Sequence, residues 1–342
     1  MNKEIETYLV SIHCMTYNQT AYITDALNGF AMQRTSFPFL ALVMDDASID
    51  GEQEVIKDYL AVHFDHSEET GFTQWETEDA CYTFARHKEN ENCFFMVVLL
   101  KRNLYRNPRK GELIKVWDEK AKYIAMCEGD DYWTDPLKLQ KQVDFLEGHE
   151  DYSMCFTNCM VKYPNCEAIA INHIWDTYTI EDVIQNNALN ARERGNRVVS
   201  CGHTSTILYR RPISDLPSWI SKCFIGDEPL FIALSQYGNA KFINEPTSTY
   251  RAGVGVSSKD FAHERDWMNR IKMYKIINEG LEYRYKQIIN PIIASFYFML
   301  CKLLWKNGSK WQSLKCGVQS FFADRHVITQ WLRQKPASRN EQ

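Results

Sequence analysis

Apolar runs alternate with amphipathic stretches along the first 130 residues of the chain. Runs typical of buried strands cover 8–14, 39–44, 94–100 and 123–127. Helical patterns lie at 19–33, after Gly51 and near 111–121. Strands separated by helical patterns predict βαβ units and a mainly parallel sheet. Strands of such a sheet are buried on both faces, which explains why they read as continuous apolar runs.

The second half of the chain has a more mixed pattern. Strand patterns cover 154–162 and 205–209, and a helical pattern covers 227–237. Gly and Ser cluster near residue 255, which indicates a boundary, and helical patterns then run from 262 to 334. We therefore expect an α/β domain over residues 1–255 and a C-terminal helical extension over residues 256–342.

Two polar stretches are expected to lie on the surface. Residues 63–93 are polar and acidic, which favours a loop or a peripheral helix over core structure. Lys138, Lys141 and Gln142 follow Pro136 in a helical pattern, and we expect them on the outer face of that helix.

Composition and charge narrow the class of protein. The chain has 342 residues, a net charge of −5 and a pI of about 6.0, without the basic excess of a general nucleic-acid binder. Its eleven cysteines form no C-x-x-C pair, which favours buried thiols in a reducing compartment over disulfides or a zinc site. The first residues lack the apolar core of a signal peptide, so we expect a cytoplasmic protein.

Acidic residues follow two of the expected strands. Asp45, Asp46 and Ser48 come directly after the second strand, where their oxygens could bind the base and ribose of a nucleotide. Ligands of open α/β sheets bind at the carboxyl ends of strands. The alternative is a turn that caps the next helix, because Asp and Ser favour such positions.

A second acidic run, Glu128-Gly129-Asp130-Asp131, follows the fourth strand. Three carboxylates in four residues repel one another unless a cation lies among them, and a divalent metal with diphosphate oxygens would meet that need. The alternative is a solvated acidic turn. Asp227 and Glu228 open a later helix, where a carboxylate is commonly only a cap or a partner of the helix dipole.

Together these motifs resemble a known family. TYN at 16–18, DDAS at 45–48, EGDDYWTDPLKLQKQ at 128–142 and GDEPL at 226–230 are similar to the motifs of family 2 glycosyltransferases of the bacterial surface-polysaccharide type. The resemblance covers residues 8–255. It implies the GT-A fold, a Rossmann-like mixed sheet flanked by helices.

The resemblance also implies roles for individual residues. Asp131 would bind Mn²⁺ or Mg²⁺, and Asp227 would be the catalytic base. Asp46 is the favoured direct contact to the uracil or ribose. The expected nucleotide-sugar-binding residues are Thr16, Tyr17, Asn18, Asp45, Asp46, Ser48, Asn103, Asp130 and Arg251. Two positions depart from the family pattern: Glu128 stands where many members have Asp, which leaves its role open, and Gly226 replaces a common Glu.

Three further residues are candidates for the acceptor side of the site. Trp133 could stack on a sugar face, with core packing as the alternative. His203 could line the acceptor side, with a structural role as the alternative. Glu228 is included because it adjoins the expected base.

The expected activity is that of an inverting glycosyltransferase of the hexosyltransferase type. It would move a sugar from a nucleotide-diphosphate sugar, with UDP-sugars favoured, to a glycan or a lipid-linked glycan in polysaccharide biosynthesis. One alternative is a nucleotidyltransferase, but its Gly-rich basic loop is replaced by CMTYNQ at 14–19. The other alternative is a non-catalytic module that binds nucleotides or glycans.

The C-terminal helical region raises the question of membrane contact. Residues 288–305 include 14 apolar residues among 18, a stretch too short and too interrupted to predict a membrane span. Basic and aromatic residues lie in and beyond it: Lys302, Trp305, Lys306, Lys310 and Trp311. The stretch is typical either of a helix packed on the main domain or of an interfacial helix on the inner face of the cell membrane.

Overall fold

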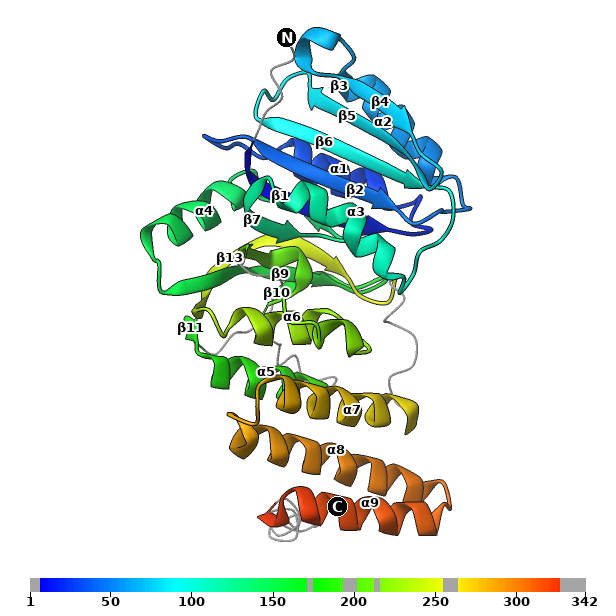
Figure 1. Ribbon diagram of the computed structural model, residues 1–342, viewed down its shortest axis with the longest axis vertical. Helices are drawn as coiled ribbons and strands as arrows, with labels where there is room; N and C mark the ends of the chain where they lie inside the picture. The colour runs from blue at the N-terminus through cyan, green and yellow to red at the C-terminus, as the bar shows by residue number, and fades with distance from the viewer. Residues whose placement is uncertain (1–6, 171–174, 193–201, 212–215, 255–263, 327–342) are drawn as a thin grey trace.

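The computed structural model describes residues 7–170, 175–192, 202–211, 216–254 and 264–326. A mixed sheet with the strand order β11-β13-β9-β12-β7-β1-β2-β6-β5-β3 forms its core. Helices flank this sheet, and three more helices stack beneath it (Figure 1). The expected fold class, a mixed α/β sheet flanked by helices with helices at the C-terminal end, is confirmed.

The parallel centre of the sheet comes from the apolar runs at the start of the chain. Its elements are β1 (Tyr8–Thr16), α1 (Ile23–Ala31), β2 (Phe39–Asp45), α2 (Glu52–His63), β6 (Cys93–Leu100), α3 (Pro108–Asp118) and β7 (Ala121–Met126). β1 pairs in parallel with both β2 and β7, and β2 with β6. Every residue of β2 and β6 is buried, as expected for strands covered on both faces.

The expectation of a loop or peripheral helix at 63–93 is wrong. This stretch forms β3 (Phe64–Asp65), the short 3₁₀ helix η1 (Glu68–Thr70), β4 (Thr73–Glu76) and β5 (Ala80–His87). β5 lies antiparallel to β6, and β3 and β4 lie antiparallel to β5 at the sheet edge. All four residues of β4 are exposed, so a polar sequence is compatible with an edge strand.

The second half of the chain completes the sheet. It contains β8 (Tyr132–Trp133), α4 (Lys138–Gly148), β9 (Tyr152–Lys162), β10 (Ile169–Ala170), β11 (Thr177–Tyr178), α5 (Ile180–Arg192), η2 (Thr204–Thr206), β12 (Ile207–Arg210), η3 (Ile220–Lys222), α6 (Asp227–Leu234) and β13 (Asn239–Arg251). β12 is antiparallel to β7 and β9, whereas β13 is parallel to β9 with register shifts around Pro246. The sequence patterns did not predict α5 or β13.

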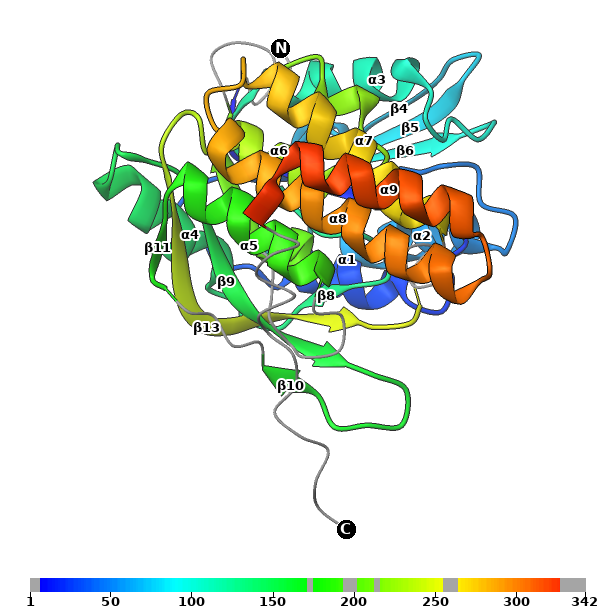
Figure 2. The same ribbon diagram turned by 90° about the horizontal axis from the view of Figure 1, so that it is seen from below.

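The C-terminal helices are α7 (Glu264–Gly280), α8 (Lys286–Lys306) and α9 (Lys310–Ala323). α8 packs against both α7 and α9, and it contacts α5 (Figures 1 and 2). Residues of these helices share one hydrophobic core with α5, α6 and the second half of the sheet. The expected boundary at residue 255 falls at the edge of 255–263, outside the described residues, and stays a prediction.

One helix in the described part of the chain is long and apolar enough to cross a bilayer. This helix, α8, has a mean hydropathy of 1.6 over its most apolar window, and half of that window is buried inside the protein. Half-burial is a property of a core helix, so the structure favours packing over spanning for this segment.

Candidate active site

The candidate site lies where the direction of the sheet changes. From β1 the chain moves outward to β2 and β6, and it then returns to place β7 on the other side of β1. In open α/β sheets, ligands bind outside the carboxyl ends of the strands at such a switch point, and we call that edge of this sheet the crevice. Thr16 ends β1 at this place, directly between the acidic residues that follow β2 and those that follow β7.

Backbone contacts bring both acidic loops against the end of β1. Asp46 N donates to Thr16 O at 3.0 Å, and Gly129 N donates to Met15 O at 3.3 Å. Gly129 is needed for this approach, because a Cβ there would lie 2.6 Å from Gln19 Oε1 and would also collide with the Thr16 hydroxyl. The structure therefore brings together the two carboxylate motifs that were expected to share one site.

Glu52, which the sequence analysis missed, ties the loops together. It is fully buried at the start of α2 and accepts hydrogen bonds from the Thr16 hydroxyl, from Gln19 N at 2.9 Å and from the Ser48 hydroxyl at 2.8 Å. Burial raises the pKa of Glu52, whereas these hydrogen bonds lower it. In the sequence, Glu52 resembled an ordinary helix start, and nothing there indicated its burial.

The expected nucleotide-binding residues of the first loop divide into two groups. Thr16, Asn18 and Ser48 are used within the protein: Asn18 N donates to Ser48 Oγ at 2.8 Å, and Asn18 Oδ1 accepts from Ile49 N at 2.9 Å. Asn18 takes a positive φ of 55°, a conformation that Asn tolerates. Tyr17 is 40% exposed, so its ring lies open at the edge of the crevice.

Asp45 and Asp46 differ in the oxygens that they leave for a ligand. Asp46 Oδ1 accepts from Leu104 N at 2.6 Å, Oδ2 pairs with Lys110 Nζ at 2.9 Å, and its carbonyl accepts from Asn103 Nδ2 at 2.9 Å. Asp45 Oδ2 is buried and has no hydrogen-bond partner among the described residues. Asp45 therefore carries an unpaired acceptor that is covered by protein, whereas Asp46 and Asn103 hold the segment after β6 in place.

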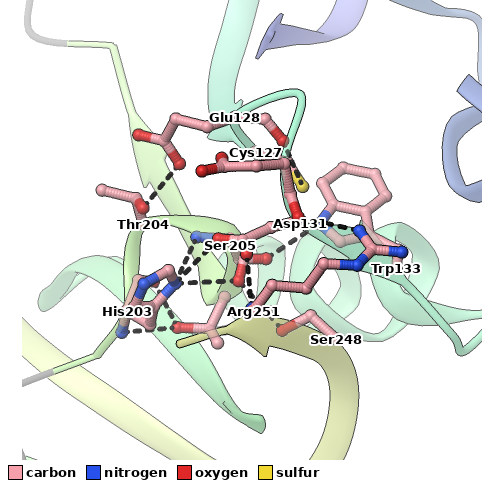
Figure 3. A network of polar contacts seen from close by, with 11 residues as sticks. Cys127, Glu128, Asp131, Trp133, His203, Thr204, Ser205, Ser248 and Arg251 are labelled. Atoms are coloured by element: carbon pink, nitrogen blue, oxygen red, sulfur yellow. Dashed lines mark hydrogen bonds and ion pairs between the residues drawn. The ribbon is translucent and has the colours of Figure 1, made fainter. Parts of the chain in front are cut away.

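The acidic run after β7 is buried and crowded. Asp131 is 2% exposed, and burial raises its pKa to about 7, although the Arg251 backbone N–H, 2.9 Å from Oδ1, lowers it. The charge of Asp130 raises the pKa of Asp131 further. Burial also raises the pKa of Glu128, which accepts a hydrogen bond from Thr204 Oγ1 at 2.7 Å (Figure 3). A bound cation would offset the repulsion between these carboxylates and would lower their raised pKa values.

Arg251, at the end of β13, closes one side of the acidic run. Its guanidinium donates to Asp130 O at 2.8 Å and lies 4.3 Å from the centre of the Tyr132 ring. It also pairs with Asp25 on α1. The structure thus places this expected nucleotide-sugar ligand at the cluster, with its side chain held by backbone, ring and carboxylate.

Asp227 faces the same cluster from α6. It is exposed and is the first residue of that helix. Burial lowers the pKa of the His203 imidazole, and the negative charges of Glu128, Asp227 and Asp130 raise it, which indicates that Asp227 lies near enough to interact with this imidazole. The expected metal ligand and the expected base therefore border one crevice.

A second bridge joins the two sides of the crevice. Arg106, in the segment between β6 and α3, donates to Phe224 O at 3.3 Å, three residues before Asp227. The same segment holds Asp46 through Leu104 N. The loops after β2, β6 and β7 and the start of α6 consequently form one continuous rim.

The expected sugar-stacking role of Trp133 is incompatible with its position. Trp133 is 2% exposed, its ring centre lies 5.1 Å from that of Phe30, and its Nε1 donates to Ser205 O at 2.8 Å. A side chain with no open face cannot stack on a sugar, so the alternative interpretation, core packing, holds. Glu228 is likewise 6% exposed and pairs with Arg270 of α7 at 3.0 Å, which gives it a structural role instead of an acceptor contact.

The expected outer-face position of Lys138 and Gln142 is also wrong. Both side chains are fully buried. Lys138 Nζ donates to Gln142 Oε1 at 2.5 Å and to Thr206 O at 3.3 Å, and Gln142 Nε2 donates to Thr206 O at 2.9 Å. Burial lowers the pKa of Lys138 to about 8. Lys141, by contrast, lies near the surface, where it pairs with Asp135 at 2.8 Å.

Three buried side-chain donors hold the turn that carries His203. Trp133, Lys138 and Gln142 all donate to carbonyl oxygens of η2. His203 caps this turn, with Nδ1 3.0 Å from Ser205 Oγ and 3.7 Å from Asp131 Oδ2 (Figure 3). His203 therefore has a structural role and also lies beside the acidic run.

The carboxylates around Asp131 could hold a metal ion only together with ligands from a substrate. Within the described ranges, no group of three or more His, Cys, Asp or Glu side chains is arranged to hold a metal ion. Mg²⁺ is commonly bound by one or two carboxylates plus substrate phosphates, and it keeps several waters. Asp131 Oδ1 accepts from Arg251 N, so Oδ2, which lies 3.7 Å from His203 Nδ1, is the oxygen that would meet a cation, and the phosphates of a ligand would complete the site.

A hollow of about 600 Å³ lies at the opposite edge of the sheet. It borders the amino ends of β1 and β7, and its lining includes Lys120, Lys122 and Arg211. Lys122 pairs with Glu147 at 2.7 Å, and Arg211 Nε donates to Ala121 O at 2.9 Å, so two of these cations already have partners. The carboxylate clusters lie at the other edge, which is where we place the chemistry.

The fold and the site together define a mixed α/β protein with converging carboxylates at the switch point of its sheet. No family model matches the chain. Uncharacterized proteins from Mycobacterium bovis and from two strains of Mycobacterium tuberculosis are each 34% identical over 154 residues, or 45% of this chain. The match covers 36% of those proteins, so the chain spans about a third of the length of the curated relatives it matches.

Solved structures of similar shape are more distant. Staphylococcus aureus TarS 1–349 has a TM-score of 0.47 at 14% identity and covers 96% of this chain and 93% of its own. The same protein in complex with UDP has a TM-score of 0.46 at equal identity and coverage. The mannosyltransferase PcManGT from Pyrobaculum calidifontis, in complex with GDP-Man and Mn²⁺, has a TM-score of 0.45 at 11% identity, covering 97% and 89% of the two chains. At these scores the likeness carries no argument about activity.

Proposed function

We propose that the protein is an inverting glycosyltransferase that transfers a sugar from a nucleoside-diphosphate sugar to a hydroxyl of an acceptor glycan. The observation that carries the proposal is the convergence of three separate acidic motifs on one crevice. Asp45 and Asp131 are far apart in the sequence, yet backbone hydrogen bonds hold their loops against the end of β1, and the charge of Asp227 acts on His203, which lies 3.7 Å from Asp131. The resemblance of EGDDYWTDPLKLQKQ to family 2 glycosyltransferases supports the same activity.

The donor nucleotide would lie between the first two loops. Asp45, whose buried Oδ2 has no hydrogen-bond partner among the described residues, would lie beside the base. Tyr17 offers an exposed ring beside it. Asp130 lies on the other side of β1, where it would bind the ribose or the sugar. We favour a UDP-sugar as the donor.

Asp131 would hold a divalent cation, Mn²⁺ or Mg²⁺, together with the phosphates of the donor. When bound, such an ion would neutralise charge on the departing nucleoside diphosphate. Asp131 itself would become fully ionised in that complex, because a nearby positive charge lowers the pKa that burial has raised to about 7.

Asp227 would be the general base. Its carboxylate is exposed at the start of α6, where an acceptor hydroxyl can reach it. It would take the proton of that hydroxyl as the oxygen attacks the anomeric carbon from the side opposite the leaving group, which inverts the configuration. Proton transfer by a positioned side chain typically contributes about 10²–10⁴-fold to the rate.

The acceptor would be a growing surface polysaccharide or a lipid-linked glycan at the cytoplasmic face of the membrane, and the reaction would be of the hexosyltransferase type. The resemblance of the motifs supports this context. Trp133 and Glu228, expected on the acceptor side, are buried. Asp227 and His203 are therefore the residues that would border the acceptor.

The test is release of nucleoside diphosphate from a panel of nucleotide sugars with Mn²⁺, with and without glycan acceptors. We expect Asp131→Asn to lose donor binding and turnover. Asp227→Asn should keep donor binding but lose transfer by at least about 10²-fold. Asp58→Asn, which removes an exposed carboxylate on α2, is the matched control and should keep full activity.

The same experiment separates the competing functions. Donor binding without turnover in the wild-type protein would identify a binding module. Full transfer activity in Asp227→Asn would exclude Asp227 as the base, and activity in EDTA equal to that with Mn²⁺ would exclude the cation.

A further inference from the structure

In the described part of the chain, α9 has an apolar face that no other described helix or strand covers. On α9 five large apolar side chains are half or more exposed: Trp311 (86%), Leu314 (56%), Val318 (54%), Phe321 (50%) and Phe322 (82%). Their spacing of three and four residues places them on one side of the helix. The opposite side, with buried Ser313, Cys316 and Ser320, packs on α8. Figure 2 shows α9 lying on the outside of α8.

The end of α8 continues this surface. Trp305 is 58% exposed in the last turn of α8, directly before the short connection to α9. Exposed aromatic and aliphatic side chains gathered on one helix face differ from the singly scattered apolar residues of ordinary surfaces. We call Trp305 and the five α9 residues the apolar face.

The charged side chains of α8 and α9 themselves are all lysines. Residues 286–323 contain five lysines, Lys286, Lys302, Lys306, Lys310 and Lys315, and no Asp or Glu, although the whole chain has a net charge of −5. All five lysines are exposed. A cationic, aromatic-rich helix face with this composition is typical of a helix that lies in the interface of an anionic membrane.

We propose that α9 and the end of α8 dock the protein on an anionic lipid surface, with the apolar face in the headgroup region and the lysines against lipid phosphates. Pairing with a second copy through the same face would bring two clusters of like charge together, which disfavours self-association. Spanning is also disfavoured, because α9 has 14 residues, fewer than the roughly 20 that cross a bilayer, and half of the apolar window of α8 is buried.

The docked helices are connected to the crevice through a buried ion pair. Glu228 adjoins Asp227 on α6 and pairs with Arg270 of α7, and α7 packs on α8. Docking would therefore hold the start of α6 at a fixed height above the lipid, which suits an acceptor that is anchored there. The docking itself does not rest on the proposed function, since lipid binding is measured without catalysis.

The test is co-sedimentation of the full chain with vesicles of phosphatidylcholine alone or with about 30% phosphatidylglycerol. We expect binding to the anionic vesicles that falls with added salt, because salt screens exposed charges. Trp311→Ser with Phe322→Ser should lose at least about tenfold in partitioning. Lys310→Glu with Lys315→Glu should abolish the preference for anionic lipid.

The control variant is Val62→Ser with Val116→Ser, which removes two exposed apolar residues from α2 and α3, far from α9 (Figure 1). It should bind as the wild type does. Circular dichroism and the thermal midpoint should be unchanged in the Trp311 and Phe322 variant, since both side chains are exposed. Equal vesicle binding by that variant and the wild type would overturn the proposal. Dimerisation that the variant loses, without lipid binding by the wild type, would assign the face to a second copy.

Discussion

Asp131→Asn should make the unliganded protein more stable at neutral and alkaline pH. Asp131 is 2% exposed, and burial together with the charge of Asp130 raises its pKa from 3.8 to about 7. The folded protein therefore carries an unfavourable ionised carboxylate above pH 7. Asn has the same shape, and its Oδ1 can still accept the hydrogen bond from Arg251 N.

The size and sign of the effect follow from proton linkage. Asp131 ionises near pH 3.8 in the unfolded chain and near pH 7 in the folded protein. Between these values the unfolded state binds fewer protons, so the free energy of unfolding falls as the pH rises through this window. The full difference corresponds to roughly 4 kcal/mol, as an upper value. Asp131→Asn should recover about 2–4 kcal/mol at pH 8 and almost nothing near pH 4.

The assay is urea unfolding in EDTA at several pH values between 4.5 and 8, for the wild type, Asp131→Asn and the control Asp58→Asn. The m-values should agree between the proteins, so that the difference in midpoint reports stability. Asp58 lies on the exposed side of α2, and its variant should track the wild type at every pH. A stability difference for Asp131→Asn that is independent of pH, or that is destabilising at pH 8, would refute the reasoning.

Three further variants test other parts of the account. Arg270→Met removes the guanidinium that pairs with the buried Glu228 and should lower the free energy of unfolding by about 3–5 kcal/mol in urea. Gly129→Ala places a Cβ against the Thr16 hydroxyl and should weaken donor binding about tenfold by calorimetry, since a displaced loop misplaces Asp131. Trp133→Phe removes the donor to the η2 carbonyl and should cost about 1–3 kcal/mol in thermal unfolding while lowering transfer. Unchanged values in any of these would contradict the role given to that residue.

The centre of the fold was predictable because its strands are buried on both faces. β2 and β6 are continuous apolar runs, and no helix of that length would bury every residue. β5 and β13 were missed for opposite reasons. β5 lies near the polar sheet edge, where alternation is weak, and β13 contains Pro246 and shifts register three times. Local sequence does not encode such irregular pairing.

The residues of the candidate site also divide into those whose positions the sequence predicted and those whose positions it did not. Positions at strand ends, such as Asp45 and Asp131, follow from topology alone once the strands are found. The buried position of Lys138 does not follow from topology, because a lysine at a helix start is expected to be solvated. Lys138 is buried where it donates to the carbonyl oxygen of Thr206 in η2, a residue almost seventy positions later in the chain. A single sequence does not show which residues form such long-range hydrogen bonds.

The proposed function requires that one crevice binds a nucleoside diphosphate together with a divalent cation at Asp131. The most direct measurement is the thermal midpoint with UDP, GDP and their sugars, each with and without Mn²⁺, for the wild type, Asp131→Asn and Asp227→Asn. Each protein is compared with its own unliganded midpoint. The account predicts a Mn²⁺-dependent rise, equivalent to about 2.7 kcal/mol at a hundredfold excess over Kd, in the wild type and Asp227→Asn but not in Asp131→Asn. A midpoint that no nucleotide shifts, or an equal shift in Asp131→Asn, would contradict it.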